Sequence, residues 1–168
     1  EILRQSEPFD PGHAHGPHYL LSTSGVGYNV AKIAVPMPDA PVDSLRMVFA
    51  PSVIRNFQKC GVTFIDAPDE AVNTVLLYLG RRPNSEDPGD LAAVERVLMA
   101  IRPYVRSIES TTFIEDLANG DICLVFAWSG DVGQAAARAR EAGNGNVIRY
   151  SIPREGAMLY FDYLAIPA

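Results

Sequence analysis

Apolar residues recur with two different periods along this chain, and the two periods alternate. Residues 72–79 and residues 91–101 carry apolar side chains at the spacing that places them on one face of a helix. Short apolar runs of strand length occupy residues 62–65, 122–127, 147–152 and 159–164. The run at 122–127 is continuous, as expected of a strand that is covered on both faces. Strands that alternate with helices predict an α/β fold with a largely parallel sheet flanked by helices.

Two predicted helices have recognisable ends. Before residues 72–79, Asp66 can act as N-cap, Pro68 suits the first helical turn, and Glu70 complements the positive end of the helix dipole. Gly80 predicts the end of this helix. A shorter helix is predicted over residues 113–118, closed by Asn119-Gly120.

The first thirty residues have a different character. Residues 1–17 are polar, rich in proline and glycine, and without period, which predicts an irregular lead-in. Residues 19–21 and 26–30 predict an extended pair around Ser24-Gly25. No signal peptide precedes them, so the chain is expected to be a mature or trimmed product.

Composition narrows the classes of function. The 168 residues suit one domain with a core, and 48% hydrophobic and 20% charged residues are typical of a globular protein. A net charge of −6 without a Lys/Arg cluster argues against a nucleic-acid partner and is compatible with a cationic ligand. No apolar run approaches the roughly 20 residues that a membrane span needs.

Motifs for catalysis are missing from the sequence. It contains no Gly-rich phosphate loop, no Gly-x-Ser-x-Gly elbow and no histidine near a plausible nucleophile, so recognition is a better description than catalysis, and no cofactor is expected. The histidines at 13, 15 and 18 lie in or beside the lead-in, where no metal site is expected. Cys60 and Cys123 are compatible with two buried thiols or with one disulfide.

Candidate binding residues follow the buried run at 122–127. Ligands of such sheets bind beyond the carboxyl ends of the strands, where Trp128 and Asp131 lie. The indole face of Trp128 can hold a cation, and Asp131 can supply an anionic acceptor. The alternative is that Trp128 packs in the core while Asp131 caps the next helix.

Two further positions have a similar chemistry. In a strand over residues 159–164, Tyr160 and Asp162 share a face, which places an aromatic ring beside a carboxylate. The alternative is an edge strand with Asp162 in water. Glu70 is ambiguous by itself, because a glutamate in the first helical turn is favoured by the helix dipole alone.

Six segments of the chain are shared, in this order, with one family. They are SGVGYNV at 24–30, CGVTFIDAP at 60–68, YLG at 78–80, DLANGDIC at 116–123, WSGDV at 128–132 and SIPREGAM at 151–158. Together they resemble the putrescine-type polyamine receptors of bacterial ABC transporters. The resemblance implies a periplasmic-binding-protein-like fold of type II, in which two lobes close on a polyamine in the periplasm and a membrane permease reads the closed state.

The resemblance also implies that only part of a receptor is present. Residues 18–168 resemble the second lobe, with the crossing into it near residues 20–28 and the return near residues 165–168. The first lobe and the C-terminal segment are then absent. The amine ligands that the resemblance implies are Glu70, Ser110, Trp128, Asp131, Tyr160 and Asp162. It also pairs Cys60 with Cys123 in a disulfide.

Three positions depart from the family pattern. Tyr160 stands where phenylalanine is expected, Leu20 where an aromatic residue is common, and Gly133 where a bulkier residue is expected. The implied function is the substrate-binding component of a polyamine importer, a non-enzymatic module that here carries half of the amine site. The alternative is a polyamine-sensing or protein-interaction module that keeps the receptor fold without transport.

Overall fold

The computed structural model describes residue 4, residues 6–8 and residues 10–165. Its strands are β1 (His18–Asn29), β2 (Val62–Phe64), β3 (Ser107–Ile108), β4 (Leu124–Trp128), β5 (Ile148–Ser151) and β6 (Leu159–Tyr163). Its helices are α1 (Val30–Ala34), α2 (Arg46–Phe49), α3 (Pro51–Ile54), α4 (Pro68–Tyr78), α5 (Pro88–Ile101), α6 (Phe113–Asn119) and α7 (Ser129–Ala142). Short 3₁₀ turns are η2 (Pro11–His13), η3 (Arg55–Phe57) and η4 (Arg102–Tyr104).

The strands form one mixed sheet with the order β3-β2-β4-β1-β5, and β6 pairs with β1. β2 is parallel to β3 and to β4, whereas β1 is antiparallel to β4, β5 and β6. The predicted α/β class with flanking helices is confirmed. The prediction of a largely parallel sheet is correct for strand direction, since β1 alone runs opposite to the other five strands. It is wrong for pairing, because β1 takes part in three of the five pairings and all three are antiparallel.

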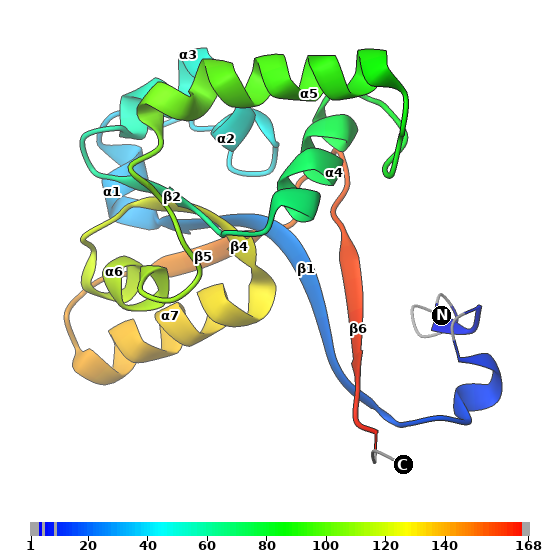
Figure 1. Ribbon diagram of the computed structural model, residues 1–168. Helices are drawn as coiled ribbons and strands as arrows, with labels where there is room; N and C mark the ends of the chain where they lie inside the picture. Colours follow the sequence, from blue (N-terminus) through cyan, green and yellow to red (C-terminus); the bar gives the residue numbers. More distant parts are fainter. Residues whose placement is uncertain (1–3, 5, 9, 166–168) are drawn as a thin grey trace.

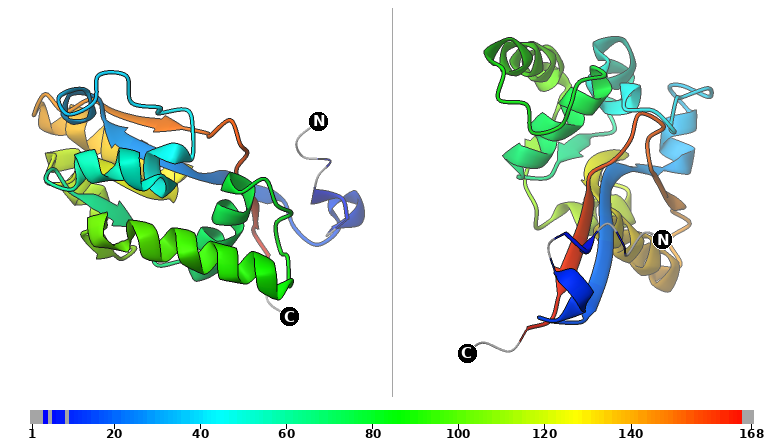
Figure 2. Two further views of the ribbon diagram at one scale, coloured as in Figure 1. Left: turned by 90° about the horizontal axis from the view of Figure 1, so that it is seen from above. Right: turned by 90° about the vertical axis from the view of Figure 1, so that its right-hand side faces the viewer.

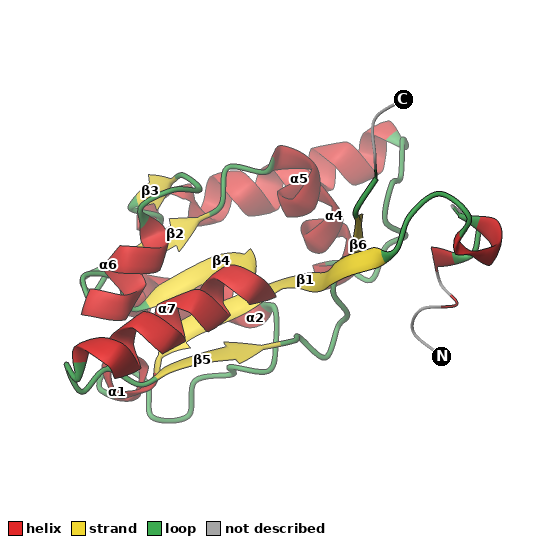
Figure 3. Ribbon diagram, turned by 90° about the horizontal axis from the view of Figure 1, so that it is seen from below, coloured by secondary structure: helices red, strands yellow, loops and turns green. Residues whose placement is uncertain are grey.

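Helices cover both faces of the sheet, and a two-stranded ribbon extends from one end of it (Figure 1). α2, α3, α4 and α5 lie on one face, and α6 and α7 lie on the other (Figures 1 and 3). β4 lies in the middle of the sheet, with residues 124–127 fully buried, which confirms the prediction of a strand covered on both faces. Phe49, Phe64 and Phe126 pack there with ring centroids 5.5–5.9 Å apart.

The ribbon consists of the first half of β1 and of β6 (Figure 2). The predicted pair of strands around Ser24-Gly25 is wrong, because β1 is a single strand of 12 residues that continues through both. Gly25 does not turn the chain. It lets β5 approach, since a Cβ at this position would lie 2.5 Å from the Tyr150 hydroxyl and 2.6 Å from the Ser151 carbonyl oxygen.

The ends of the helices agree with the sequence in part. α6 ends at Gly120, whose φ of +81° is the left-handed conformation that glycine adopts without strain. α4 begins at Pro68 as predicted, but Asp66 is not its N-cap. Ala67 occupies the N-cap position, and the Asp66 backbone N–H instead donates to the Ser110 hydroxyl.

A disulfide joins Cys60 to Cys123, with the Cα atoms 5.5 Å apart, which confirms the implied pairing. The two cysteines precede β2 and β4, so the disulfide links the amino ends of neighbouring parallel strands. Among the described residues, no helix is both long and apolar enough to cross a bilayer. Of the implied return near residues 165–168, residues 166–168 lie outside the described residues.

Candidate ligand-binding site

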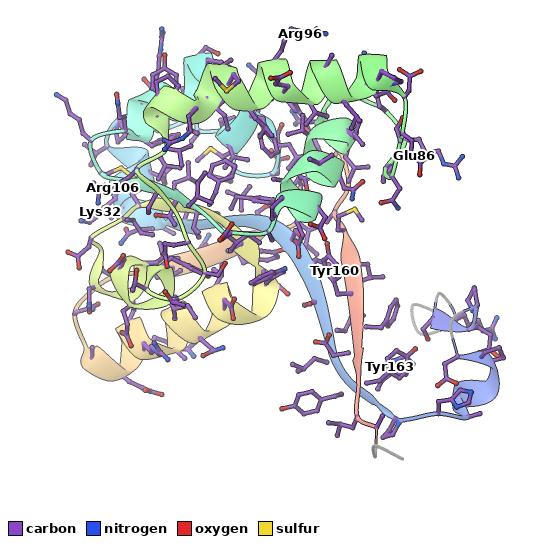
Figure 4. The ribbon with its side chains drawn as sticks, in the orientation of Figure 1. Lys32, Glu86, Arg96, Arg106, Tyr160 and Tyr163 are labelled. Carbon is purple, nitrogen blue, oxygen red and sulfur yellow. A yellow bond between two sulfur atoms is a disulfide. The ribbon has the colours of Figure 1, made fainter. Side chains whose placement is uncertain are left out.

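Side chains from four strand positions meet where the ribbon joins the body. Ser22 and Ser24 lie two residues apart on β1 and therefore share one face. Ser22 is opposite Tyr160 of β6, and Ser24 is opposite Trp128 of β4. Since directly paired residues of antiparallel strands point to the same face, the four side chains lie together. Figure 4 shows Tyr160 at the body end of the ribbon, whereas Tyr163 lies further along it.

A hollow of about 440 Å³ opens over this face. Its lining residues are Leu20, Ser22, Glu70, Trp128, Gly130, Asp131, Gln134, Tyr160 and Asp162. Five of the six predicted ligands are among them, and they come from α4, β4, α7 and β6. The lining contains three carboxylates and no lysine or arginine. Its charge therefore favours a cation.

A second hollow of about 540 Å³ adjoins the first and shares Glu70, Trp128 and Tyr160 with it. It adds the carboxylates of Asp66 and Asp69 to the lining. Ser110, the sixth predicted ligand, lines neither hollow. Its hydroxyl accepts the Asp66 backbone N–H at 2.9 Å, so in this structure Ser110 contacts the segment that leads into α4.

Glu70 is buried in the first turn of α4, with 8% of its surface exposed. One carboxylate oxygen accepts a hydrogen bond from the Ser24 hydroxyl, and the other accepts one from the Trp128 indole N–H. Burial of a carboxylate is costly unless donors satisfy it, and these two donors supply that compensation. The helix dipole alone does not explain Glu70, because it requires neither the burial of the side chain nor the two hydrogen bonds that it accepts.

Trp128 combines the two roles that the sequence left open. It is half-buried and packs against the core, and it also lines the hollow. Asp131 is not the cap of α7, because Trp128 itself occupies the N-cap position. Asp131 lies in the first turn of α7 and faces the hollow, where partial burial raises the pKa of its carboxyl.

Tyr160 and Asp162 share one face of β6, as the strand period predicts. Both alternatives for Asp162 hold, since its side chain is exposed at the edge of the ribbon and also lines the hollow. Burial, together with the negative charge of Glu70, raises the pKa of Tyr160 to about 12. The hydroxyl that distinguishes this residue from phenylalanine therefore interacts with the charge of the buried carboxylate, with which Tyr160 shares the hollow.

Sequence reasoning missed Ser22, Ser24 and Gln134. Gln134 follows Asp131 by three residues on α7, and its amide lies 3.5 Å from the Asp131 carboxylate. The two serines were missed because β1 was divided into two strands. A period of two across Leu20, Ser22 and Ser24 is the signal that would have placed them on the face of the site.

Curated proteins that are similar in sequence to this chain are named for the amines that they bind. It is 45% identical over 170 residues to the putrescine-binding periplasmic protein PotF of Escherichia coli and 44% identical over 168 residues to the putrescine-binding periplasmic protein SpuD of Pseudomonas aeruginosa. The chain is a homologue of the periplasmic putrescine-binding proteins. The alignments cover 100% and 99% of this chain but 46% of each relative, so the chain spans about half the length of these putrescine-binding proteins. No family model matches it.

Solved structures agree on the fold. The spermidine/putrescine ABC transporter substrate-binding protein PotD of Streptococcus pneumoniae superimposes with a TM-score of 0.73 at 22% identity, over 96% of this chain and 45% of that one. The Tp0655 lipoprotein of Treponema pallidum gives a TM-score of 0.74 at 20% identity, over 99% and 49%. The fold of the chain is thus similar to that of about half of each of these two proteins.

Proposed function

We propose that this chain is the second lobe of a periplasmic polyamine receptor and that its acidic hollow is one wall of the amine site. The observation that carries the proposal is the convergence of Glu70, Trp128, Asp131, Tyr160 and Asp162 on one hollow without a lysine or arginine in its lining. The proposed role is the substrate-binding component of an ABC importer, with a membrane permease as partner. The disulfide fits the oxidising periplasm, where the proposal locates the protein.

The chemistry of the hollow suits a linear diamine. Such a ligand has an ammonium group at each end and an apolar chain between them. Glu70 and Asp131 supply carboxylates, and the Trp128 ring can contact the methylene groups or one ammonium by cation–π attraction. Amine binding is a recognition function, and no step of it requires a cofactor or a covalent intermediate.

The length of the chain sets the expected affinity. A chain that supplies only part of the contacts to the ligand binds about tenfold more weakly for each 1.4 kcal/mol of binding free energy that is missing. Because this chain corresponds to 46% of its relatives, we expect weak binding, with a dissociation constant of about 1 mM or higher.

Isothermal titration calorimetry of the chain with three four-carbon ligands tests the proposal. Putrescine has two ammonium groups, 1-butylamine has one, and 1,4-butanediol has none. We expect the affinity to fall in that order, and Glu70→Gln to weaken putrescine binding. Equal responses to putrescine and butanediol would refute an amine site. Nanomolar binding by the isolated chain would contradict the expectation that it carries only half of the amine site.

A further inference from the structure

Ser24 connects β1, the strand that extends out of the body, to Glu70, the carboxylate that is proposed as an amine ligand. Ser24 is fully buried on β1, and its hydroxyl donates to Glu70. Thr23 is the last residue of β1 that pairs with β6, and Ser24 is the first that pairs with β4. Ser24 thus lies where β1 passes from its pairing with β6 to its pairing with β4. Figure 1 shows this passage of β1 from the ribbon into the body of the molecule.

Neighbouring contacts fix the backbone at this point. The Thr23 backbone N–H donates to the Ser129 hydroxyl at 3.2 Å, and the Tyr150 hydroxyl donates to the Thr23 carbonyl oxygen at 2.8 Å. The Ser24 backbone N–H donates to the Met158 carbonyl oxygen at 3.2 Å. Contacts from α7, from β5 and from the loop before β6 therefore hold residues 23–24, so the Ser24 hydroxyl is presented from a fixed backbone.

Glu70 depends on few donors. Its side chain accepts hydrogen bonds from Ser24 and from Trp128. A carboxylate offers about four lone-pair sites, so acceptor capacity remains for an ammonium group. Which lone pairs remain open to an ammonium group depends on how the carboxylate is rotated, and the Ser24 hydroxyl holds the oxygen that the indole N–H does not contact.

We propose that Ser24 is a positioning residue, which orients the Glu70 carboxylate for an ammonium group and links the amine site to β1 where β1 enters the ribbon. The proposal rests on the proposed amine-binding function, because it assigns Glu70 the role of ligand. Ser24 itself does not line either hollow and so acts through Glu70 rather than on the amine.

The chain offers a matched control. Ser44 is also fully buried, and its hydroxyl also donates to a glutamate, Glu155. Glu155 lines neither of the two hollows that contain Glu70. Ser44→Ala therefore removes a hydrogen bond between the same two side-chain types, at a half-buried glutamate that is not part of the proposed amine site.

The single tryptophan gives a direct readout of Glu70. Because the Trp128 indole N–H donates to the Glu70 carboxylate, its ¹H–¹⁵N resonance reports where that carboxylate lies. In the ligand-free chain, Ser24→Ala and Glu70→Gln should each shift this resonance, whereas Ser44→Ala should leave it in place. An unmoved resonance in folded Ser24→Ala would overturn the proposal.

Putrescine titration of the same samples, followed by NMR, tests the binding role. Loss of one hydrogen bond to a charged group predicts about tenfold weaker binding for Ser24→Ala and unchanged binding for Ser44→Ala. If Ser24 acts through Glu70, Ser24→Ala should add little to Glu70→Gln, and full additivity of the two effects would contradict the proposal. A wild-type chain that binds no amine would refute the proposed function, while the ligand-free resonance would still show separately whether Ser24 holds Glu70.

Discussion

At the scale of single residues, the site combines carboxylates in three different environments. Glu70 is buried and satisfied by two donors, Asp131 is half-buried, and Asp162 is exposed. The three groups therefore contribute differently to folding and to recognition. A buried carboxylate with donors is a fixed acceptor, whereas a half-buried carboxylate without a cation nearby raises the free energy of the ligand-free fold.

The pKa of Asp131 makes this cost measurable. Burial raises this pKa above its ordinary value of 3.8, so the folded state binds the proton more tightly than the unfolded state does. The resulting stability is fully present below pH 3.8 and is lost as the pH rises through the raised pKa. The charged carboxylate thus disfavours the ligand-free fold at neutral pH, although solvent screening keeps the effect small.

Asp131→Asn is expected to raise the melting temperature at neutral pH by about 1–3 °C, because it removes a partly desolvated charge. The gain should disappear below pH 3.8, and putrescine binding should weaken. Thermal unfolding at the two pH values, together with titration, checks this. Asp121→Asn, at an exposed position outside the hollow, is the control; an equal gain there would show that the effect reflects only net charge.

At the scale of elements, the long strand β1 organises the site. One half pairs with β6 in the ribbon, and the other half pairs with β4 and β5 in the body. Leu20 and Ser22 of the ribbon half therefore line the same hollow as Trp128 at the end of β4. A break in β1 would separate the two groups of side chains.

Gly25→Ala tests this continuity, because a Cβ there would lie 2.5 Å from the Tyr150 hydroxyl and 2.6 Å from the Ser151 carbonyl oxygen. We expect a loss of about 1–3 kcal/mol in the free energy of unfolding, measured by urea denaturation. Gly133→Ala is the matched control, because its Cβ would meet no atom within 4 Å on α7. That variant should gain about 0.5–1 kcal/mol through helix propensity. Equal effects at both positions would contradict the close approach at Gly25.

At the scale of the whole molecule, the disulfide and the proposed amine site lie at opposite ends of β4. Cys123 precedes the first residue of this strand and Trp128 is its last. The disulfide closes a sequence separation of 63 residues between Cys60 and Cys123. The proposed amine site lies at the other end of the strand and shares no residue with the disulfide.

Reduction of the disulfide, or the double substitution of Cys60 and Cys123 by serine, is therefore expected to cost about 2–4 kcal/mol in the free energy of unfolding. Amine binding should persist at temperatures where the variant remains folded. Chemical denaturation with and without reductant measures the first effect, and titration below the unfolding transition measures the second. Loss of binding by the fully folded reduced chain would show that the two ends of β4 are coupled.

Local patterns determined the elements and much of the chemistry. The buried run before Trp128, the helices ended by Gly80 and Gly120, and the shared face of Tyr160 and Asp162 follow from side-chain period and backbone preference, which act over a few residues. The disulfide pairing and the ligand set came from the family resemblance. The structure confirms the pairing and brings together five of the six ligands, while their role in binding stays a prediction.

Only the tertiary structure decided the continuity of β1, the position of Ser110 outside the hollows and the contact of Ser24 with Glu70. Ser24 and Glu70 are 46 residues apart, and Ser24 and its strand partner Trp128 are separated by even more of the chain. No local pattern encodes such a separation. It is fixed by the order in which strands pair, and that order depends on burial of the whole core rather than on the preferences of any single segment.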